Sequence, residues 1–309
     1  MKKFLIKIGI FIVICLSVAV AIEFLLFTQT NDYSYKRKYV EQHINDIEIL
    51  FLGNSHIEYA VKPELVGKNT FNMAISGRSN IYDVEIAKRY IPQMHNLKVV
   101  FMPLDYICFS FGRGQKNVNE KRVRNNRLDD FYKCMYTKYM GTNVDPFYYW
   151  SEIIFSPVNY MSRFFKREDE NRECNELGYI PLDINCRCAN WEYLNMPPFI
   201  DINKPIAKEQ FLTLKDRYSL LAALTKQFNV RLILLGTPMY ETYQKDLNPI
   251  VLEEILSFVE ILKKDYDNIE YYDFTFDTDF LPNDFNDASH LNDFGAEKFS
   301  KKLRQVVEM

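Results

Sequence analysis

The stretch Ile47-Glu48-Ile49-Leu50-Phe51-Leu52-Gly53-Asn54-Ser55-His56 decides the fold. Its short apolar run stops at Gly53-Asn54, a pattern typical of a buried strand followed by a turn. Three further runs have the same character, and they cover Leu97–Met102, Val230–Leu235 and Ile269–Phe274. The chain therefore offers several short, buried strands that recur at intervals along its length.

Segments with helical patterns lie between and after these runs. They cover about residues 80–94, 208–228, 249–264 and 295–307. Strands that alternate with helices pair in parallel and form a sheet covered on both faces. The sequence thus predicts an α/β domain over residues 47–309.

The alternation breaks between about residues 111 and 200. This stretch is rich in Arg, Asn, Tyr and Phe and shows no strand–helix rhythm. We interpret it as an insertion or lid on the side of the sheet where the strands end, and a segment of this length needs some structure of its own.

The amino-terminal region, residues 1–29, is strongly apolar. Between residues 4 and 27 only Lys7 and Glu23 are charged, and the run is long enough for a helix to cross ~30 Å of hydrocarbon. A retained anchor and a cleaved signal peptide are both open, because Ala19-Val20-Ala21 has the pattern of a cleavage site. The apolar residues 24–27 beyond that site favour the anchor. Residues 30–46 are polar and suit a stalk.

The basic residues at the start of the chain predict its orientation. Lys2, Lys3 and Lys7 should stay in the cytoplasm by the positive-inside rule. We therefore expect a single-pass protein with a cytoplasmic N-terminus and an extracytoplasmic domain, in the periplasm or at the cell surface.

The overall composition excludes several classes of protein. The 309 residues are 48% hydrophobic and 26% charged, which rules out global disorder and collagen-like or coiled-coil chains. The 38 basic and 41 acidic residues give a net charge of −3, which argues against nucleic acid as a partner. The aromatic content of 15% hints at contact with carbohydrate or lipid.

Six cysteines stand at positions 15, 108, 134, 174, 186 and 188. Cys186-x-Cys188 has a spacing that metal sites use, but no further cysteine pair or histidine accompanies it, so no metal is expected. A disulfide that involves Cys174 and a set of free thiols are both open.

Candidate site residues follow the strands, since ligands bind at the carboxyl ends of parallel strands. Ser55 follows the first strand, Gly77 lies in a small-residue turn after residues 70–74, and Asp287 and His290 lie beyond the last strand. A serine hydroxyl needs a nearby base to act as a nucleophile, and the base needs an orienting carboxylate. Ser55, His290 and Asp287 fit these three roles, although Asp284 is an alternative carboxylate.

These blocks resemble the SGNH (GDSL-type) hydrolase family. Gly53-Asn54-Ser55-His56 stands in place of the Gly-Asp-Ser block, and Asp287-x-x-His290-Leu291-Asn292 matches the terminal Asp-x-x-His block. The resemblance implies a flavodoxin-like, three-layer fold and acyl chemistry that needs no metal or organic cofactor. It also implies an oxyanion hole formed by the N–H groups of Ser55 and Gly77.

The sequence departs from this family in its third block. The family pattern Gly-x-Asn-Asp should supply an Asn side chain to the oxyanion hole, but this chain has Met102-Pro103-Leu104-Asp105-Tyr106. Asn80 is a possible substitute, or the hole has backbone donors only. Asp105 either touches the site or caps a turn, and His56 is interpreted as structural.

Three functions are compatible with these residues. The first is an ester hydrolase that removes O-acyl groups, such as O-acetyl, from a cell-surface glycan, in the manner of a membrane-anchored, extracytoplasmic SGNH branch. The second is an O-acyltransferase that uses the same acyl-serine intermediate. The third is a non-catalytic glycan-binding or assembly protein on this fold.

Overall fold

The computed structural model describes residues 1–77, 79–110, 134–142, 172–197 and 208–309. The chain divides into two compact units. The first unit comprises Met1–Lys38 and Asn119–Glu173, and the second comprises Tyr39–Val118 and Cys174–Met309. Of the predicted insertion at 111–200, the structure describes residues 134–142 and 172–197, and the rest lies outside the described residues.

The first unit contains the long helix α1 (Lys2–Thr28). Residues Lys2–Leu25 are long and apolar enough to cross a membrane by length and composition, a test that a signal sequence also passes. At the end of α1, Glu23 Oε2 accepts a hydrogen bond from Lys138 Nζ at 2.5 Å. Lys138 belongs to a π-helical turn, η2 (Tyr136–Met140). This ion pair fastens the end of the apolar helix to η2.

The second unit is built on a sheet of five parallel strands in the order β2-β1-β3-β4-β5. This order is that of flavodoxin-like folds. Leu50 on β1 pairs in register with Phe71 on one side and Val100 on the other. The predicted flavodoxin-like α/β fold is thus confirmed. The strands are β1 (Ile49–Phe51), β2 (Thr70–Asn72), β3 (Val99–Pro103), β4 (Arg231–Gly236) and β5 (Ile269–Asp273).

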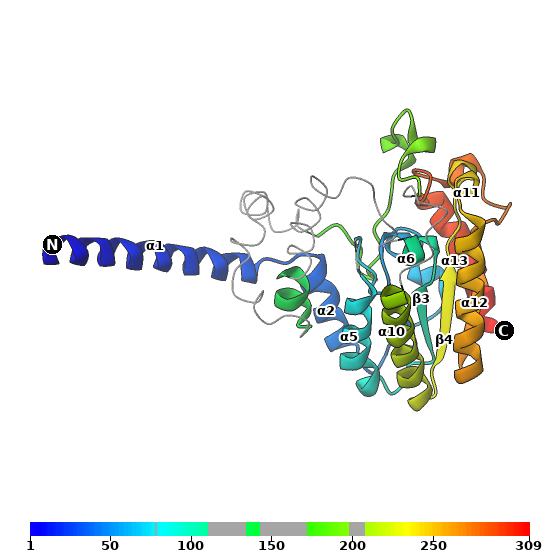
Figure 1. Ribbon diagram of the computed structural model, residues 1–309, viewed down its shortest axis with the longest axis horizontal. Helices are drawn as coiled ribbons and strands as arrows, with labels where there is room; N and C mark the ends of the chain where they lie inside the picture. The colour runs from blue at the N-terminus through cyan, green and yellow to red at the C-terminus, as the bar shows by residue number, and fades with distance from the viewer. Residues whose placement is uncertain (78, 111–133, 143–171, 198–207) are drawn as a thin grey trace. The chain divides into compact units, whose positions relative to one another are not determined.

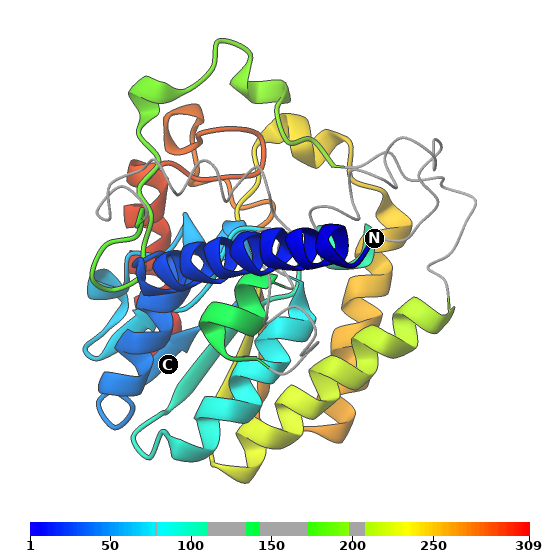
Figure 2. The ribbon, with the colours of Figure 1, turned by 90° about the vertical axis from the view of Figure 1, so that its left-hand side faces the viewer.

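Helices cover the sheet on both faces (Figures 1 and 2). One layer has α5 packed on α10 and α10 packed on α12, and the other has α13 packed on α4. The layer helices are α5 (Asn80–Tyr90), α10 (Lys208–Gln227), α12 (Pro249–Asp265), α4 (Pro63–Val66) and α13 (Asp293–Glu308). Shorter elements are α2 (Asp32–Gln42), α3 (Ser55–Glu58), η1 (Ile91–Gln93), α6 (Tyr106–Ser110), η5 (Ile184–Cys186), η6 (Trp191–Tyr193), α11 (Glu241–Lys245) and η7 (Pro282–Asp284).

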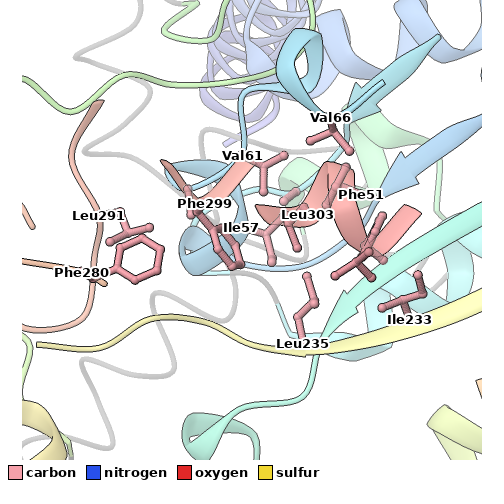
Figure 3. Close-up of a cluster of buried hydrophobic side chains, with 14 of the residues drawn as sticks. Phe51, Ile57, Val61, Val66, Ile233, Leu235, Phe280, Leu291, Phe299 and Leu303 are labelled. Carbon is pink, nitrogen blue, oxygen red and sulfur yellow. The ribbon is translucent and has the colours of Figure 1, made fainter. Parts of the chain in front are cut away.

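The apolar core on the α13 side of the sheet includes Ile57 of α3 (Figure 3). Phe51 from β1 stacks on Phe101 from β3 with ring centroids 4.4 Å apart. Ile57 of α3 and Leu303 of α13 are fully buried in the same cluster. Each such side chain contributes about 1.5–3 kcal/mol when it is buried. The core therefore gives the short α3 a rigid support.

Candidate active site

The turn after β1 can be built only with glycine at position 53. Gly53 has a φ of 131°, and a Cβ atom there would lie 2.5 Å from Cδ of Pro103. Its N–H group donates to the buried carboxylate of Asp83 at 2.9 Å. Asn54 then caps α3, since its side-chain oxygen accepts from the N–H group of His56 at 3.0 Å. Ser55 is the first residue of that helix.

The structure brings the three predicted residues together. His290 Nε2 lies 2.8 Å from Ser55 Oγ, and His290 Nδ1 lies 2.9 and 3.0 Å from the two carboxylate oxygens of Asp287. An ionised carboxylate only accepts hydrogen bonds, so Nδ1 carries the proton and Nε2 is left to accept from the serine hydroxyl. This is the geometry in which a histidine can deprotonate a serine.

Asp287 is held as a carboxylate by its hydrogen bonds. Burial, the largest influence, opposes ionisation, but the contacts with His290, the N–H group of Ser289 and the amide of Asn195 outweigh it and lower the pKa of Asp287. Asp284, the alternative carboxylate, instead pairs with Lys298 and accepts from the N–H group of Leu281 at 2.7 Å.

The surroundings of His290 favour its neutral form. Burial lowers the pKa of its imidazole below the ordinary value of 6.5, and the nearby His56 acts in the same direction, while Asp287 opposes both. Its side chain is 13% exposed, so one edge of the ring remains accessible to solvent. The neutral imidazole therefore persists to a lower pH than that of a solvated histidine.

Two backbone N–H groups at the site are available for an oxyanion. Neither Ser55 nor Gly77 has a hydrogen-bond acceptor for its N–H group among the described residues. Gly77 has a φ of 72°, in the left-handed region that favours glycine. Its loop is tied to the serine turn, because Ile75 donates to the carbonyl of Gly53 at 3.0 Å and Ser76 donates to Glu58 Oε2 at 2.6 Å.

Asn80, the predicted substitute for the third-block asparagine, begins α5. Its side-chain oxygen accepts from Arg217 Nη1 at 2.5 Å. The Nδ2 group is thus the part of this amide that is left to donate to a ligand.

Asn195 is a residue of this site that the sequence did not reveal. Its Nδ2 group donates to Asp287 Oδ2 at 3.0 Å, and the neighbouring carbonyl of Leu194 accepts from the N–H group of Ala288 at 3.2 Å. Asn195 lies at the end of the insertion, in a stretch without a recognisable motif, and has a φ of 54°. Asparagine tolerates this conformation, which is a weak signal that any turn could produce.

His56 and Asp105 form a second buried pair beside the first. His56 Nδ1 lies 2.8 Å from Asp105 Oδ2, and the two side chains are only 2% and 1% exposed. The ring of His56 meets that of His290 edge-to-face, with centroids 5.1 Å apart. Asp105 therefore lies close to the site, through His56.

No disulfide joins any of the six cysteines, all of which lie among the described residues. Cys174 is buried, whereas Cys186 and Cys188 are exposed, so the disulfide alternative for Cys174 is not adopted. Among the residues that the structure describes, no cluster of three His, Cys, Asp or Glu side chains could hold a metal ion.

No protein-family model and no curated protein matches the sequence. Among solved structures, a proposed platelet activating factor from Streptococcus pneumonia is similar at 14% identity and a TM-score of 0.43, over 95% of this chain and 99% of that one. A GDSL-like lipase from Bacteroides thetaiotaomicron is similar at 11% identity and a TM-score of 0.40, over 90% and 98%. A proposed acylhydrolase from Bacteroides fragilis is similar at 10% identity and a TM-score of 0.40, over 88% and 94%.

At these identities and TM-scores, the likenesses do not by themselves assign a fold or a function to this chain. The chain's own features are more specific, because the serine turn follows β1 and the Asp-x-x-His block immediately precedes the last helix. Together with the strand order, they give the chain an SGNH/GDSL-type hydrolase fold.

Proposed function

We propose that this protein is a serine-dependent acyl-ester hydrolase. The observation that carries the proposal is the relay in which Ser55 Oγ, His290 and Asp287 are joined by contacts of 2.8 and 2.9 Å. A serine placed in this way becomes a nucleophile when a substrate carbonyl arrives.

The proposed reaction has two halves. Ser55 Oγ attacks the ester carbonyl carbon while His290 Nε2 takes the hydroxyl proton, and the N–H groups of Ser55 and Gly77 stabilise the oxyanion. The C–O bond to the alcohol then breaks, and the alkoxide takes the proton from His290. In the second half, His290 deprotonates a water molecule that attacks the carbonyl carbon of the acyl-serine. The bond between that carbon and Ser55 Oγ then breaks, and Ser55 Oγ takes the proton back from His290. The products are a carboxylic acid and free Ser55.

We further propose that the substrate is an O-acylated glycan at the outer face of the membrane. The apolar helix α1 supports a place at the membrane, and the high aromatic content suits contact with sugars. The acyltransferase alternative differs only in the acceptor, because a sugar hydroxyl would replace water in the second half. Release of the free acid and transfer of the acyl group to a sugar distinguish the hydrolase from the transferase.

The first experiment tests for an activated serine in the full chain in detergent micelles. We would measure labelling by a fluorophosphonate and hydrolysis of a short-chain nitrophenyl ester for wild type, Ser55→Ala and His290→Ala. Ser257→Ala and His95→Ala are matched controls, because both residues are exposed and neither belongs to the two sequence blocks that carry Ser55, Asp287 and His290. Loss of both signals in the site variants alone is expected. A folded wild type that neither labels nor turns over would contradict the proposal.

The second experiment addresses substrate and location. Release of free acetate from an O-acetylated polysaccharide is expected for a hydrolase, whereas transfer of labelled acetyl to an added oligosaccharide would identify a transferase. Protease added to intact spheroplasts should remove a C-terminal tag if the domain is extracytoplasmic. A tag protected until lysis would place the domain inside instead.

A further inference from the structure

The pair formed by His56 and Asp105 is more deeply buried than the triad it adjoins. His56 is joined to Ser55 by a peptide bond, and Asp105 lies two residues beyond the end of β3. Burial opposes ionisation of Asp105 most strongly, but the hydrogen bond and charge of His56 lower its pKa, with help from the N–H group of Cys108. Since the carboxylate only accepts, Nδ1 of His56 carries a proton toward it.

This contact fixes the backbone at Ser55. The N–H group of His56 is capped by Asn54 at 3.0 Å, and its side chain is held by Asp105 at 2.8 Å. The residue after the serine is therefore held both through its backbone and through its side chain. Ser55, which lies between Gly53 and His56, carries both the hydroxyl and the proposed oxyanion N–H group. The orientation of both groups therefore depends on these two anchors.

The same imidazole also limits where His290 can lie. The rings of His56 and His290 make an edge-to-face contact at 5.1 Å with planes at 68°, and Tyr59 makes another at 5.5 Å and 69°. Asp287 holds one nitrogen of His290 at 2.9 Å. These two ring contacts and the hydrogen bond to Asp287 together hold the imidazole in one orientation, with Nε2 toward Ser55.

We propose that His56 and Asp105 are a positioning pair that holds Ser55 and His290 in reactive alignment, in a part of the chain where the SGNH pattern has an asparagine. The inference rests on the proposed function. It gives a role to Asp105 in the stretch Met102–Tyr106, where this chain lacks the asparagine of the family pattern.

A positioning pair of this kind also affects how His290 titrates. The titratable groups near His290 are Asp287, His56, Asp105 and Tyr59. Asp287 and Asp105 raise its pKa, whereas His56 lowers it. Replacing His56 with a side chain that cannot be protonated should therefore raise the pKa of His290, and the pH midpoint of Ser55 reactivity should move up with it.

The test uses the full chain in micelles and four variants. His56→Asn keeps an amide donor near the position of Nδ1, and Asp105→Asn removes the charge with little change in shape. The double variant tests whether the two residues act together. Ile57→Val is the control, because Ile57 is fully buried on the same short helix but faces the apolar core. We would measure the rate of fluorophosphonate labelling against pH, kcat and KM for the nitrophenyl ester, and Tm.

We expect His56→Asn to lose about 10-fold or more in kcat with little change in KM, since small misplacements of reacting groups are costly. Its pH midpoint should rise. The double variant should be no slower than the slower single variant, because residues that act as a unit are not additive. Ile57→Val should lower Tm without moving the midpoint.

Three results would overturn the inference while leaving the proposed function intact. They are a folded His56→Asn variant with unchanged kcat and midpoint, additive losses in the double variant, and an equal midpoint shift in Ile57→Val. If His56→Asn fails to fold, Asp105→Asn provides the same comparison of kcat with KM. Absence of labelling in wild type would instead reject the proposed function itself.

Discussion

Asn195 donates a hydrogen bond from Nδ2 to Asp287 Oδ2 at 3.0 Å. Asp287 Oδ1 is already occupied by the N–H groups of Ser289 and His290, at 2.9 and 3.0 Å. Asn195 thus supplies the amide contact to the second oxygen, which also faces His290 Nδ1. A residue from the end of the insertion thereby completes the surroundings of the proposed orienting carboxylate.

Asn195→Gly should lower kcat/KM by about 10-fold. One hydrogen bond to a charged group is worth about 1.5–3 kcal/mol, and 1.4 kcal/mol corresponds to a factor of ten. Glycine keeps the left-handed backbone, so Tm should change little. Asn195→Asp should lower kcat/KM further, because it places a second carboxylate next to that of Asp287. Asn190→Ala, an exposed position in the same segment, is the control. Equal activity of Asn195→Asp and wild type would argue against the role of this contact.

The pH dependence should reflect the depressed pKa of His290. Its neutral form increases as pH rises through the folded pKa, which lies below 6.5. The value of kcat/KM should therefore climb with pH, reach its midpoint below about 6.5 and stay flat to neutral pH. The same depression makes a contribution to stability that is present above 6.5 and lost as pH falls through the folded pKa. A midpoint clearly above 6.5 in the nitrophenyl ester assay would contradict the predicted direction.

Gly53→Ala should destabilise the domain by about 2 kcal/mol or more and remove activity. The new Cβ atom would clash with Pro103 at 2.5 Å, and a φ of 131° is strained for alanine. Thermal unfolding and fluorophosphonate labelling would measure the two effects. Gly67→Ala is the control, since φ there is ordinary and the nearest atom is the flexible end of Ile49 at 3.0 Å. If Gly53→Ala keeps the Tm and the labelling of wild type, the turn accommodates a Cβ atom and the prediction is wrong.

Glu58→Ala should release the loop that carries Gly77. The buried Glu58 accepts from the N–H group of Ser76 at 2.6 Å, and without it the neighbouring Gly77, the proposed oxyanion donor, loses its support. We expect kcat to fall by about 10-fold with a smaller change in KM, because the lost interaction matters most in the transition state. The exposed Glu64 provides the control variant Glu64→Ala. A rise in KM alone would assign Glu58 to substrate binding.

Much of the sheet could be predicted because buried strands are apolar and short. The predicted run Leu97–Met102 became β3 (Val99–Pro103), and Val230–Leu235 became β4 (Arg231–Gly236). The strand β2 (Thr70–Asn72) was harder to identify, because only Phe71 in it is strongly apolar. Its buried Asn72 is satisfied by the carbonyls of Ile57 and Val61, which no local pattern indicates.

The predicted site residues were found by order and spacing within two short blocks. Ser55, Asp287 and His290 could be named because nucleophile, base and carboxylate chemistry restricts the residue types. Asp105 was named as a residue that touches the site or caps a turn, but its pairing with His56 could not be predicted, and neither could Asn195. A contact between residues 49 or 92 positions apart depends on how the folded segments meet. His56 was interpreted as structural, and the pairing with Asp105 now gives that interpretation a specific partner.

The order of the chain has a consequence for how this protein is made. Ser55 leaves the ribosome early, whereas His290 comes just before α13, whose Ser300 hydroxyl accepts from the N–H group of Lys62 at 2.8 Å. The proposed base, His290, therefore reaches Ser55 only when nearly the whole sequence has been synthesised and has docked. We expect a nascent or truncated chain without His290 to carry no activated serine.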